Sequence, residues 1–362
     1  MTRKLRIGIP HGDINAIGYE LIFKTFNCEE IFEQCTPIVY GTPKAAAYHR
    51  NALGMQPLFT IINRVEEVKD GKLNILTTID DDLRFELGKP TGEAEKMAKT
   101  ALDKALADLQ EGHVDLLVLT PSGLIDGQTQ EDYIARQLQQ ADNSLLILVG
   151  EQMKVALATH HLPIEKVADA IDEARLAGKI EQFIRSLRRD FRVGKPRIAV
   201  LSLNTAETNS NVDGAKVTPV VQQLREKNIN AYGPFNPEDF FANRQYQAFD
   251  GVLALYDAQA TIPFSCLNAE KGVYLLAGMN HVVAFPQVTD RYENVGKGLA
   301  DEAAFRKAVF TAIDVYRHQG VYDEAYANPL PKLYREKRDE SEKVRFNIPK
   351  KHEAAEENGT DN

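Results

Sequence analysis

Short apolar runs alternate along the chain with longer segments in which apolar residues recur every three or four positions. The short runs are continuous in Val, Ile and Leu, which is typical of strands buried on both faces. They predict a largely parallel sheet covered by helices. The predicted strands span residues 5–9, 37–40, 115–120, 145–150, 155–159, 197–203, 251–256 and 273–277.

The intervening segments have helical periodicity. In residues 93–109, for example, Ala94, Ala98, Ala101 and Leu102 fall on one helical face. The other predicted helices span residues 179–191, 217–227 and 302–316. Alternation of strands and helices indicates the α/β class. From residue 333 the chain is charged and nearly without aliphatic residues, and we expect disorder from about Asn347.

Composition narrows the class of protein. The 362 residues suggest two or three domains. With 43 Lys and Arg against 52 Asp and Glu, the net charge of −9 argues against a nucleic-acid or anionic-membrane partner. Three cysteines are too few for a disulfide framework and fit a reducing compartment. No apolar stretch reaches signal-peptide or membrane-span length, so we expect a cytoplasmic protein.

Candidate chemistry first appears after residues 5–9, where a glycine-containing turn leads into a helix. Ligands of α/β proteins bind at this edge of the sheet, so His11 and Asp13 could reach a ligand from the turn. The alternative is structural: Gly12 and Gly18 serve the turn, and Asp13 caps the helix.

The segment Gly12–Glu20 resembles the opening motif of the 4-hydroxythreonine-4-phosphate dehydrogenases, the PdxA family. Further similar segments follow in order over roughly residues 5–340: 155–164, 196–204, 250–259 and 296–298. The resemblance implies two α/β/α domains with a cleft between them, like isocitrate and isopropylmalate dehydrogenases. The first domain would span residues 1–125 plus 300–330, the second 126–299, and a charged tail 331–362.

The resemblance also implies an activity. Family members use NAD to oxidise a secondary alcohol, after which the product loses CO₂, and a divalent metal held by three histidines stabilises the charge that develops. A homodimer neighbour contributes to the site. Carried over to this sequence, the resemblance implies catalytic roles for Asp257 and Gln259, metal ligands at His161 and Asp257, cofactor contacts at Gly296 and Gly298, and substrate contacts at Asp13, Asn204 and Gln130.

The sequence departs from the family pattern where the chemistry belongs. His161 matches the first metal histidine, but the loop after Asn204 lacks the second, and Asp257 replaces the third. Leu124 stands in place of a lysine, and the segment beginning at Gln130 replaces a GHTE motif. In residues 283–290 a valine replaces an arginine, and Thr289-Asp290 replaces a Gly-Thr loop, which places a carboxylate where a pyrophosphate would bind.

These departures leave two hypotheses open. The chain is a divergent paralogue that kept the scaffold and is impaired or altered in the reaction, or it is a working dehydrogenase of pyridoxal phosphate biosynthesis with an atypical site. Asp257 could join His161 in binding a hard cation, or serve as a plain polar residue. Strand alternation predicts that His160 faces away from His161. The acidic residues Asp126, Glu131 and Asp132 are interpreted as a solvated cluster.

Overall fold

The computed structural model describes residues 3–56, 58–79, 84, 86–205, 212–268, 272–288 and 292–328. The chain divides into a compact unit, Met1–Asp323, and a C-terminal segment, Glu324–Asn362. The compact unit carries the sheet and the candidate site. The charged tail predicted for residues 331–362, the pair Thr289-Asp290 and residues 206–211 lie outside the described residues.

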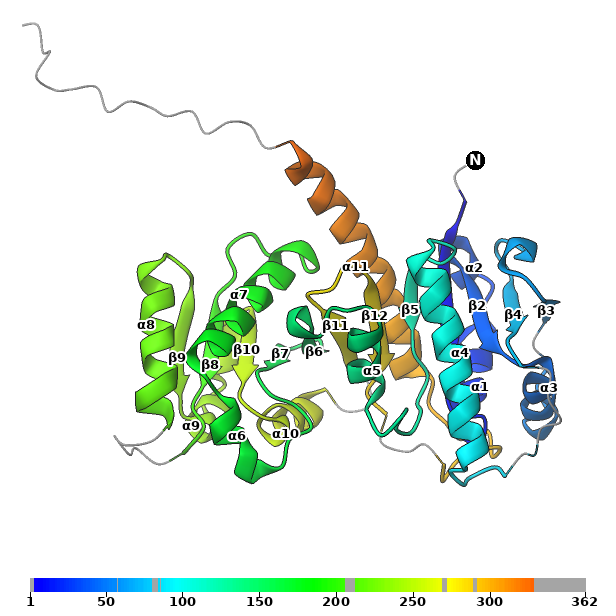
Figure 1. The fold of residues 1–362 in the computed structure, drawn as a ribbon, viewed down its shortest axis with the longest axis horizontal. Coiled ribbons are helices and arrows are strands. Elements are labelled where there is room, and N and C mark those ends of the chain that lie inside the picture. The colour runs from blue at the N-terminus through cyan, green and yellow to red at the C-terminus, as the bar shows by residue number, and fades with distance from the viewer. Residues whose placement is uncertain are drawn as a thin grey trace, which may run out of the picture. The chain divides into compact units, whose positions relative to one another are not determined.

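The compact unit is built on one twelve-stranded sheet in the order β3-β4-β2-β1-β5-β12-β11-β6-β7-β10-β8-β9 (Figure 1). Most neighbouring strands are parallel, but β12–β11, β11–β6 and β6–β7 are antiparallel. The strands are β1 Leu5–Pro10, β2 Cys35–Gly41, β3 Phe59–Ile62, β4 Leu73–Thr77, β5 Leu116–Val118, β6 Leu145–Val149, β7 Lys154–Leu157, β8 Ile198–Leu201, β9 Ala231–Phe235, β10 Gly251–Ala254, β11 Val273–Ala277 and β12 Val282–Pro286.

The helices lie on both faces of this sheet, and the four predicted ones are present. The α-helices are α1 Gly18–Thr25, α2 Ile31–Gln34, α3 Pro43–Ala52, α4 Gly92–Gln110, α5 Gln130–Gln137, α6 Ile164–Ala170, α7 Glu173–Arg189, α8 Thr218–Glu226, α9 Pro237–Ala242, α10 Asp257–Leu267 and α11 Ala303–Ala327. No helix in the described part of the chain is both long and apolar enough to cross a membrane.

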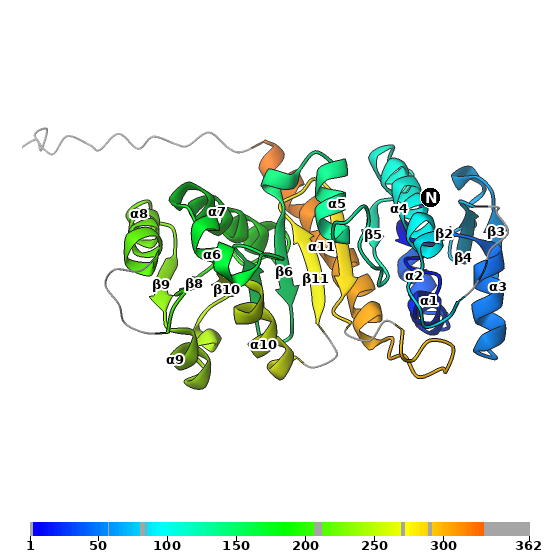
Figure 2. The ribbon, with the colours of Figure 1, turned by 60° about the horizontal axis from the view of Figure 1, so that its bottom comes forward.

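The core is continuous on one face of the sheet and divided on the other. On the first face, side chains from nearly every strand pack with Phe23 of α1, Phe183 of α7 and Phe305 of α11 in a single cluster. On the second face, one cluster gathers around α4 and α5, and a separate one around α9 and α10. Both views show β6 and β11 in the middle of the sheet (Figures 1 and 2). β12 lies beside β11, and the two clusters adjoin at these strands.

The α/β class is thereby confirmed, and all eight predicted strands are present. One sheet runs through both predicted domains, and their boundaries stay a prediction. The sequence pattern did not reveal β3, β4, β9 and β12. β3 and β9 are the two edges of the sheet, and β9 contains Gly233 and Pro234. In β4 the buried Asn74 interrupts the apolar run, and its amide donates to the backbone carbonyls of Lys69 and Lys72.

The turn after β1 joins that strand to the segment that follows β5. Gly12 has a φ of +68°, and a Cβ there would lie 2.5 Å from Thr120 Oγ1 and 2.6 Å from the Pro121 carbonyl oxygen. The Thr120 hydroxyl donates to the carbonyl of Pro10 at 2.8 Å. The opening motif therefore fixes the position of Thr120 and Pro121.

Candidate ligand-binding site

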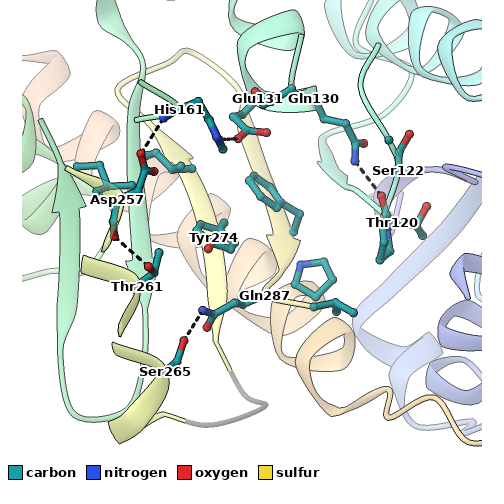
Figure 3. Close-up of a pocket in the computed structure, with 18 of the residues that line it drawn as sticks. Thr120, Ser122, Gln130, Glu131, His161, Asp257, Thr261, Ser265, Tyr274 and Gln287 are labelled. Atoms are coloured by element: carbon teal, nitrogen blue, oxygen red, sulfur yellow. Dashed lines mark hydrogen bonds and ion pairs between the residues drawn. The ribbon is translucent and has the colours of Figure 1, made fainter. Parts of the chain in front are cut away.

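A cavity of about 830 Å³ lies over the middle of the sheet, between the two clusters of its divided face. Its walls come from the segment after β5, the start of α5, the loop after β7, helix α10 and strands β11 and β12 (Figure 3). Crevices of this kind in α/β sheets are the usual ligand sites of the class. The polar and charged lining residues include Thr120, Ser122, Thr129, Gln130, Glu131, His161, Asp257, Thr261, Ser265, Cys266, Tyr274 and Gln287.

Three ionisable residues from three different elements meet at one wall of the cavity (Figure 3). His161 Nε2 lies 2.8 Å from Glu131 Oε1, and the backbone N–H of His161 donates to Asp257 Oδ2 at 2.8 Å. Glu131 is buried, whereas the His161 side chain is 46% exposed. His161 therefore links a carboxylate of α5 to a carboxylate of α10.

Local sequence explains how these side chains are placed. Thr129 is the N-cap of α5, with its hydroxyl accepting from the amide of Asp132, so Glu131 lies in the first turn. Asp257 is the first residue of α10. His161 has a φ of +53°, in the left-handed region that histidine adopts more readily than most residues. This turn of the backbone directs the His161 amide toward Asp257.

The contact between His161 and Glu131 shifts the pKa values of both in opposite directions. The hydrogen bond to Glu131, and the charge of that carboxylate, raise the pKa of His161 in spite of partial burial. Burial raises the pKa of Glu131, but the hydrogen bond from His161 and further favourable contacts outweigh it, and the net pKa is lowered. Each residue thus favours the charged form of the other.

We expect the Glu131–His161 ion pair to contribute most to the stability of the fold at mildly acidic pH. The part from Glu131 is present above the ordinary glutamate pKa of about 4.3 and is lost as pH falls through its lowered value. The part from His161 is present below the ordinary histidine pKa of about 6.5 and is lost as pH rises through its raised value. The melting-temperature difference between wild type and Glu131→Gln should be larger at pH 5.5 than at pH 8.5.

The matched control for this pH profile is Glu165→Gln, which removes an exposed carboxylate from α6. Its difference from wild type should be small and should not vary with pH in this way. A wild-type advantage over Glu131→Gln that is the same at pH 5.5 and 8.5 would contradict the assignment.

Of the residues implied by the family resemblance, the cavity brings together Gln130, His161 and Asp257. The amide of Gln130 donates to the carbonyl of Thr120 at 3.2 Å. Gln259 is buried away from the lining: its Oε1 accepts from Leu255 N and its Nε2 donates to the Ser202 carbonyl.

Asn204 and Asp13 also lie outside the lining. The Asn204 amide donates to Asp213 Oδ2 at 3.1 Å. Asp13 accepts a hydrogen bond from the backbone N–H of Asn15, and another from the hydroxyl of Tyr292 at 2.7 Å. The prediction that Asp13 caps the following helix is wrong, because the N-cap of α1 is Ile17. Asp13 instead closes its own turn.

Three further residues singled out from the sequence are absent from the cavity wall. Gly296 and Gly298 have φ values of +70° and +71° and form turns before α11. No described atom lies within 4 Å of the position that a Cβ on Gly298 would take. Its positive φ, rather than lack of space for a side chain, therefore favours glycine at this position. His11 is fully buried against Tyr19 and does not reach the cavity. Its burial lowers its pKa to about 3.

The interpretation of Glu131 as solvated is wrong, since it is 8% exposed and paired with His161. Strand alternation also fails for the two histidines, because β7 ends at Leu157. One donor atom each from Glu131, His160 and His161 lies within 4.8 Å of the others. Only His161 lines the larger cavity, however, while His160 lines a neighbouring one of about 630 Å³.

The residues at the family's metal positions do not fit a divalent ion. His161 turns Nε2 to Glu131, and Asp257 accepts from the backbone of His161 rather than facing its ring nitrogen. In the described part of the chain, neither of the two groups of potential metal donors includes Asp257. The group Glu131–His160–His161 has the donor types that zinc accepts, with donor atoms within 4.8 Å of one another, but it does not include Asp257. We assign no metal to positions 161 and 257.

The sequence did not point to the aromatic wall of the cavity. Tyr274 of β11 and Phe285 of β12 are directly opposite each other, with ring centroids 5.0 Å apart and an interplanar angle of 16°. Their role depends on the pairing of these two strands, and the sequence pattern did not reveal β12. For Glu131 a signal existed: Thr129 followed three residues later by Asp132 is the pattern of a helix start.

Fold and site together define an α/β protein with a ligand cavity at the middle of its sheet. A solved 4-hydroxythreonine-4-phosphate dehydrogenase from Burkholderia phymatum superposes with a TM-score of 0.69 at 23% identity, covering 87% of this chain and 99% of that one. An isocitrate dehydrogenase from Methylococcus capsulatus gives 0.50 at 11% identity, covering 87% of both chains. At these identities the structures show the shared fold alone.

Sequence comparison shows the family. The family model for the pyridoxal phosphate biosynthetic protein PdxA matches residues 33–312. A 4-hydroxythreonine-4-phosphate dehydrogenase from Bacteroides thetaiotaomicron is 40% identical over 354 residues, which is 95% of this chain and 97% of the relative. One from a Sulfurihydrogenibium species is 28% identical, covering 85% and 98%. The chain belongs to the PdxA family, as the resemblance of its motifs indicates.

Proposed function

We propose that this PdxA-family chain binds a small molecule in its cavity but is a divergent member, impaired or altered in the family's dehydrogenase reaction. The observation that carries the proposal is the charge of the cavity wall. No lysine or arginine occurs among the described residues that line it, whereas Glu131 and Asp257 do. A phosphate ester such as 4-hydroxythreonine-4-phosphate needs cationic or N–H partners when it is removed from water.

Two single-residue differences from the family pattern account for the charge of the cavity wall. Leu124, at the position of the family's lysine, is 55% exposed and lines the cavity. Asp257, at the position of the third metal histidine, contributes a negative charge to the same wall. The first exchange removes a cationic partner for a phosphorylated substrate, and the second adds a carboxylate that repels it. NAD and a divalent metal are the cofactors that the family resemblance implies, and we propose that this chain does not retain the metal.

The second candidate is a working 4-hydroxythreonine-4-phosphate dehydrogenase with an atypical site. It is favoured by the 40% identity to the Bacteroides thetaiotaomicron protein, which extends over nearly the whole of both chains. For either candidate we propose a homodimer in the cytoplasm that acts on a small molecule, as the family resemblance implies, without nucleic-acid or membrane partners.

The assay that separates the two candidates follows NADH formation from NAD and 4-hydroxythreonine-4-phosphate, with zinc, manganese, cobalt or magnesium added in turn. The Bacteroides thetaiotaomicron relative is the parallel control. We expect turnover at least 100-fold below the control, on the order of a lost interaction of about 2.7 kcal/mol in the transition state. Turnover comparable to the control, and abolished by His161→Ala, would establish the second candidate instead.

A further inference from the structure

The charge and shape of the cavity wall indicate which class of ligand it accepts. We propose that the cavity binds an amphipathic primary amine, with its ammonium group between the Glu131 and Asp257 carboxylates and its apolar body against the Tyr274–Phe285 pair. The inference rests on the proposed function and deepens it, because it assigns a cationic ligand to a site whose family relatives are named for a phosphorylated substrate.

The two carboxylates provide the first part of the argument. Glu131 Oε1 lies 2.8 Å from His161 Nε2, and the residue is only 8% exposed. Asp257 accepts one hydrogen bond from the His161 backbone through Oδ2, and its side chain also lines the cavity. Since one histidine stands opposite two carboxylates, an added monocation completes the charge balance of this wall. A buried anion would instead face two like charges.

Tyr274 lines the same cavity as the two carboxylates. Burial raises the pKa of Tyr274 to about 12, and the charges of Glu131 and Asp257 contribute to this rise. The close-up places Tyr274 between the His161–Glu131 contact and Gln287 (Figure 3). An ammonium group near this ring gains from the aromatic face in addition to the carboxylates, an attraction of about 0.5–2 kcal/mol depending on desolvation.

The rest of the wall suits an apolar body. Leu146 of β6, Leu157 of β7 and Ile262 of α10 line the cavity together with the stacked aromatic pair. Ile262 is 63% exposed, and an apolar group bound in the cavity would cover it. A small hydrophilic cation would leave these surfaces in contact with water, and so an amphipathic amine fits better than a polyamine.

The test uses three probes of similar size that differ in charge. These are 2-phenylethylamine, which is a cation at pH 7, the neutral 2-phenylethanol and the anion phenylacetate; inorganic phosphate is the fourth. Cys266 is exposed and lines the cavity, whereas Cys28 is exposed but is not part of the lining. Iodoacetamide labelling of the two thiols, followed by mass spectrometry, therefore reports occupancy of the cavity with an internal control.

We expect 2-phenylethylamine to slow the alkylation of Cys266 and to leave that of Cys28 unchanged. The neutral alcohol should protect at least tenfold less strongly at equal concentration, and phenylacetate and phosphate should not protect. Protection by phenylacetate or phosphate equal to that of the amine would overturn the inference. Absence of protection by the amine at 10 mM, a concentration about ten times a millimolar dissociation constant, would overturn it as well.

Two variants connect the binding to the proposed residues. Glu131→Gln and Asp257→Asn should each weaken protection by the amine at least tenfold, and neither should affect binding of the neutral alcohol. Asp132→Asn is the matched control: it removes a 40% exposed carboxylate from the same helix α5, one that lines the neighbouring cavity instead. Equal loss of amine protection in Asp132→Asn would contradict the assignment. The probe series with wild-type protein keeps the test valid if a variant does not fold.

Failure of this inference can be distinguished from failure of the proposed function. If 4-hydroxythreonine-4-phosphate is turned over at the rate of the control relative, the proposed function fails. If it is not turned over and 2-phenylethylamine does not protect Cys266, only the assignment of an amine fails.

Discussion

Replacing Gln259 with alanine should lower the free energy of unfolding by about 2–5 kcal/mol, because two buried backbone groups would lose their partners. Gln259 Oε1 accepts from Leu255 N at 2.7 Å, and Nε2 donates to the Ser202 carbonyl at 2.6 Å. The side chain thereby joins the segment after β10 to the segment after β8. With the residue 6% exposed, water cannot replace both contacts without rearrangement.

Urea denaturation of Gln259→Ala and wild type measures this effect. The control is Gln222→Ala, which shortens an exposed glutamine on α8 and should change stability by less than about 0.5 kcal/mol. The family resemblance implies a catalytic role for Gln259. If Gln259→Ala is as stable as wild type but loses ligand binding, the side chain acts on the ligand and the structural account is wrong.

Gly12→Ala should lower the free energy of unfolding by about 2–5 kcal/mol. An alanine at a φ of +68° costs about 1–2 kcal/mol in backbone energy. Its Cβ would also lie 2.5 Å from Thr120 Oγ1 and 2.6 Å from the Pro121 carbonyl, which must then move at a further cost of about 1–3 kcal/mol. Since both neighbours line the cavity, the change should also alter the rate at which Cys266 is alkylated.

Gly112→Ala separates the cost of the left-handed backbone conformation from the cost of close contact with neighbouring atoms. Gly112 has a similar φ of +75°, but no described atom lies within 4 Å of the place that an alanine Cβ would take there. It should show the backbone cost alone and leave Cys266 alkylation unchanged. If thermal melts show that Gly12→Ala and Gly112→Ala are equally destabilised, the expected cost of contact with Thr120 and Pro121 is contradicted.

The sequence predicted the middle of the sheet better than its edges. Residues 145–150 and 273–277 are continuous apolar runs because both faces of β6 and β11 are covered, and such runs are visible in the sequence. Edge strands such as β3 carry fewer buried positions: Ile61 is 55% exposed. The antiparallel pairings around β11 could not be predicted, since they depend on how the chain returns to the sheet and not on local pattern.

The site was predictable only in part. Family resemblance pointed to His161 and Asp257, which the structure brings together. It also pointed to Gln259 and Asn204, whose side chains bind other parts of the chain. The pairing of Glu131 with His161 depends on how the loop after β7 meets the start of α5, which the local sequence does not reveal.

The central claim is that this chain retains the PdxA scaffold with a cavity that no longer suits the family's phosphorylated substrate. Isothermal titration with 4-hydroxythreonine-4-phosphate, in the presence of added zinc or cobalt and with the Bacteroides thetaiotaomicron relative as positive control, tests it most directly. We predict no saturable binding below about 1 mM, the equivalent of a binding free energy weaker than about −4 kcal/mol. A micromolar dissociation constant, matching that of the control, would contradict the claim.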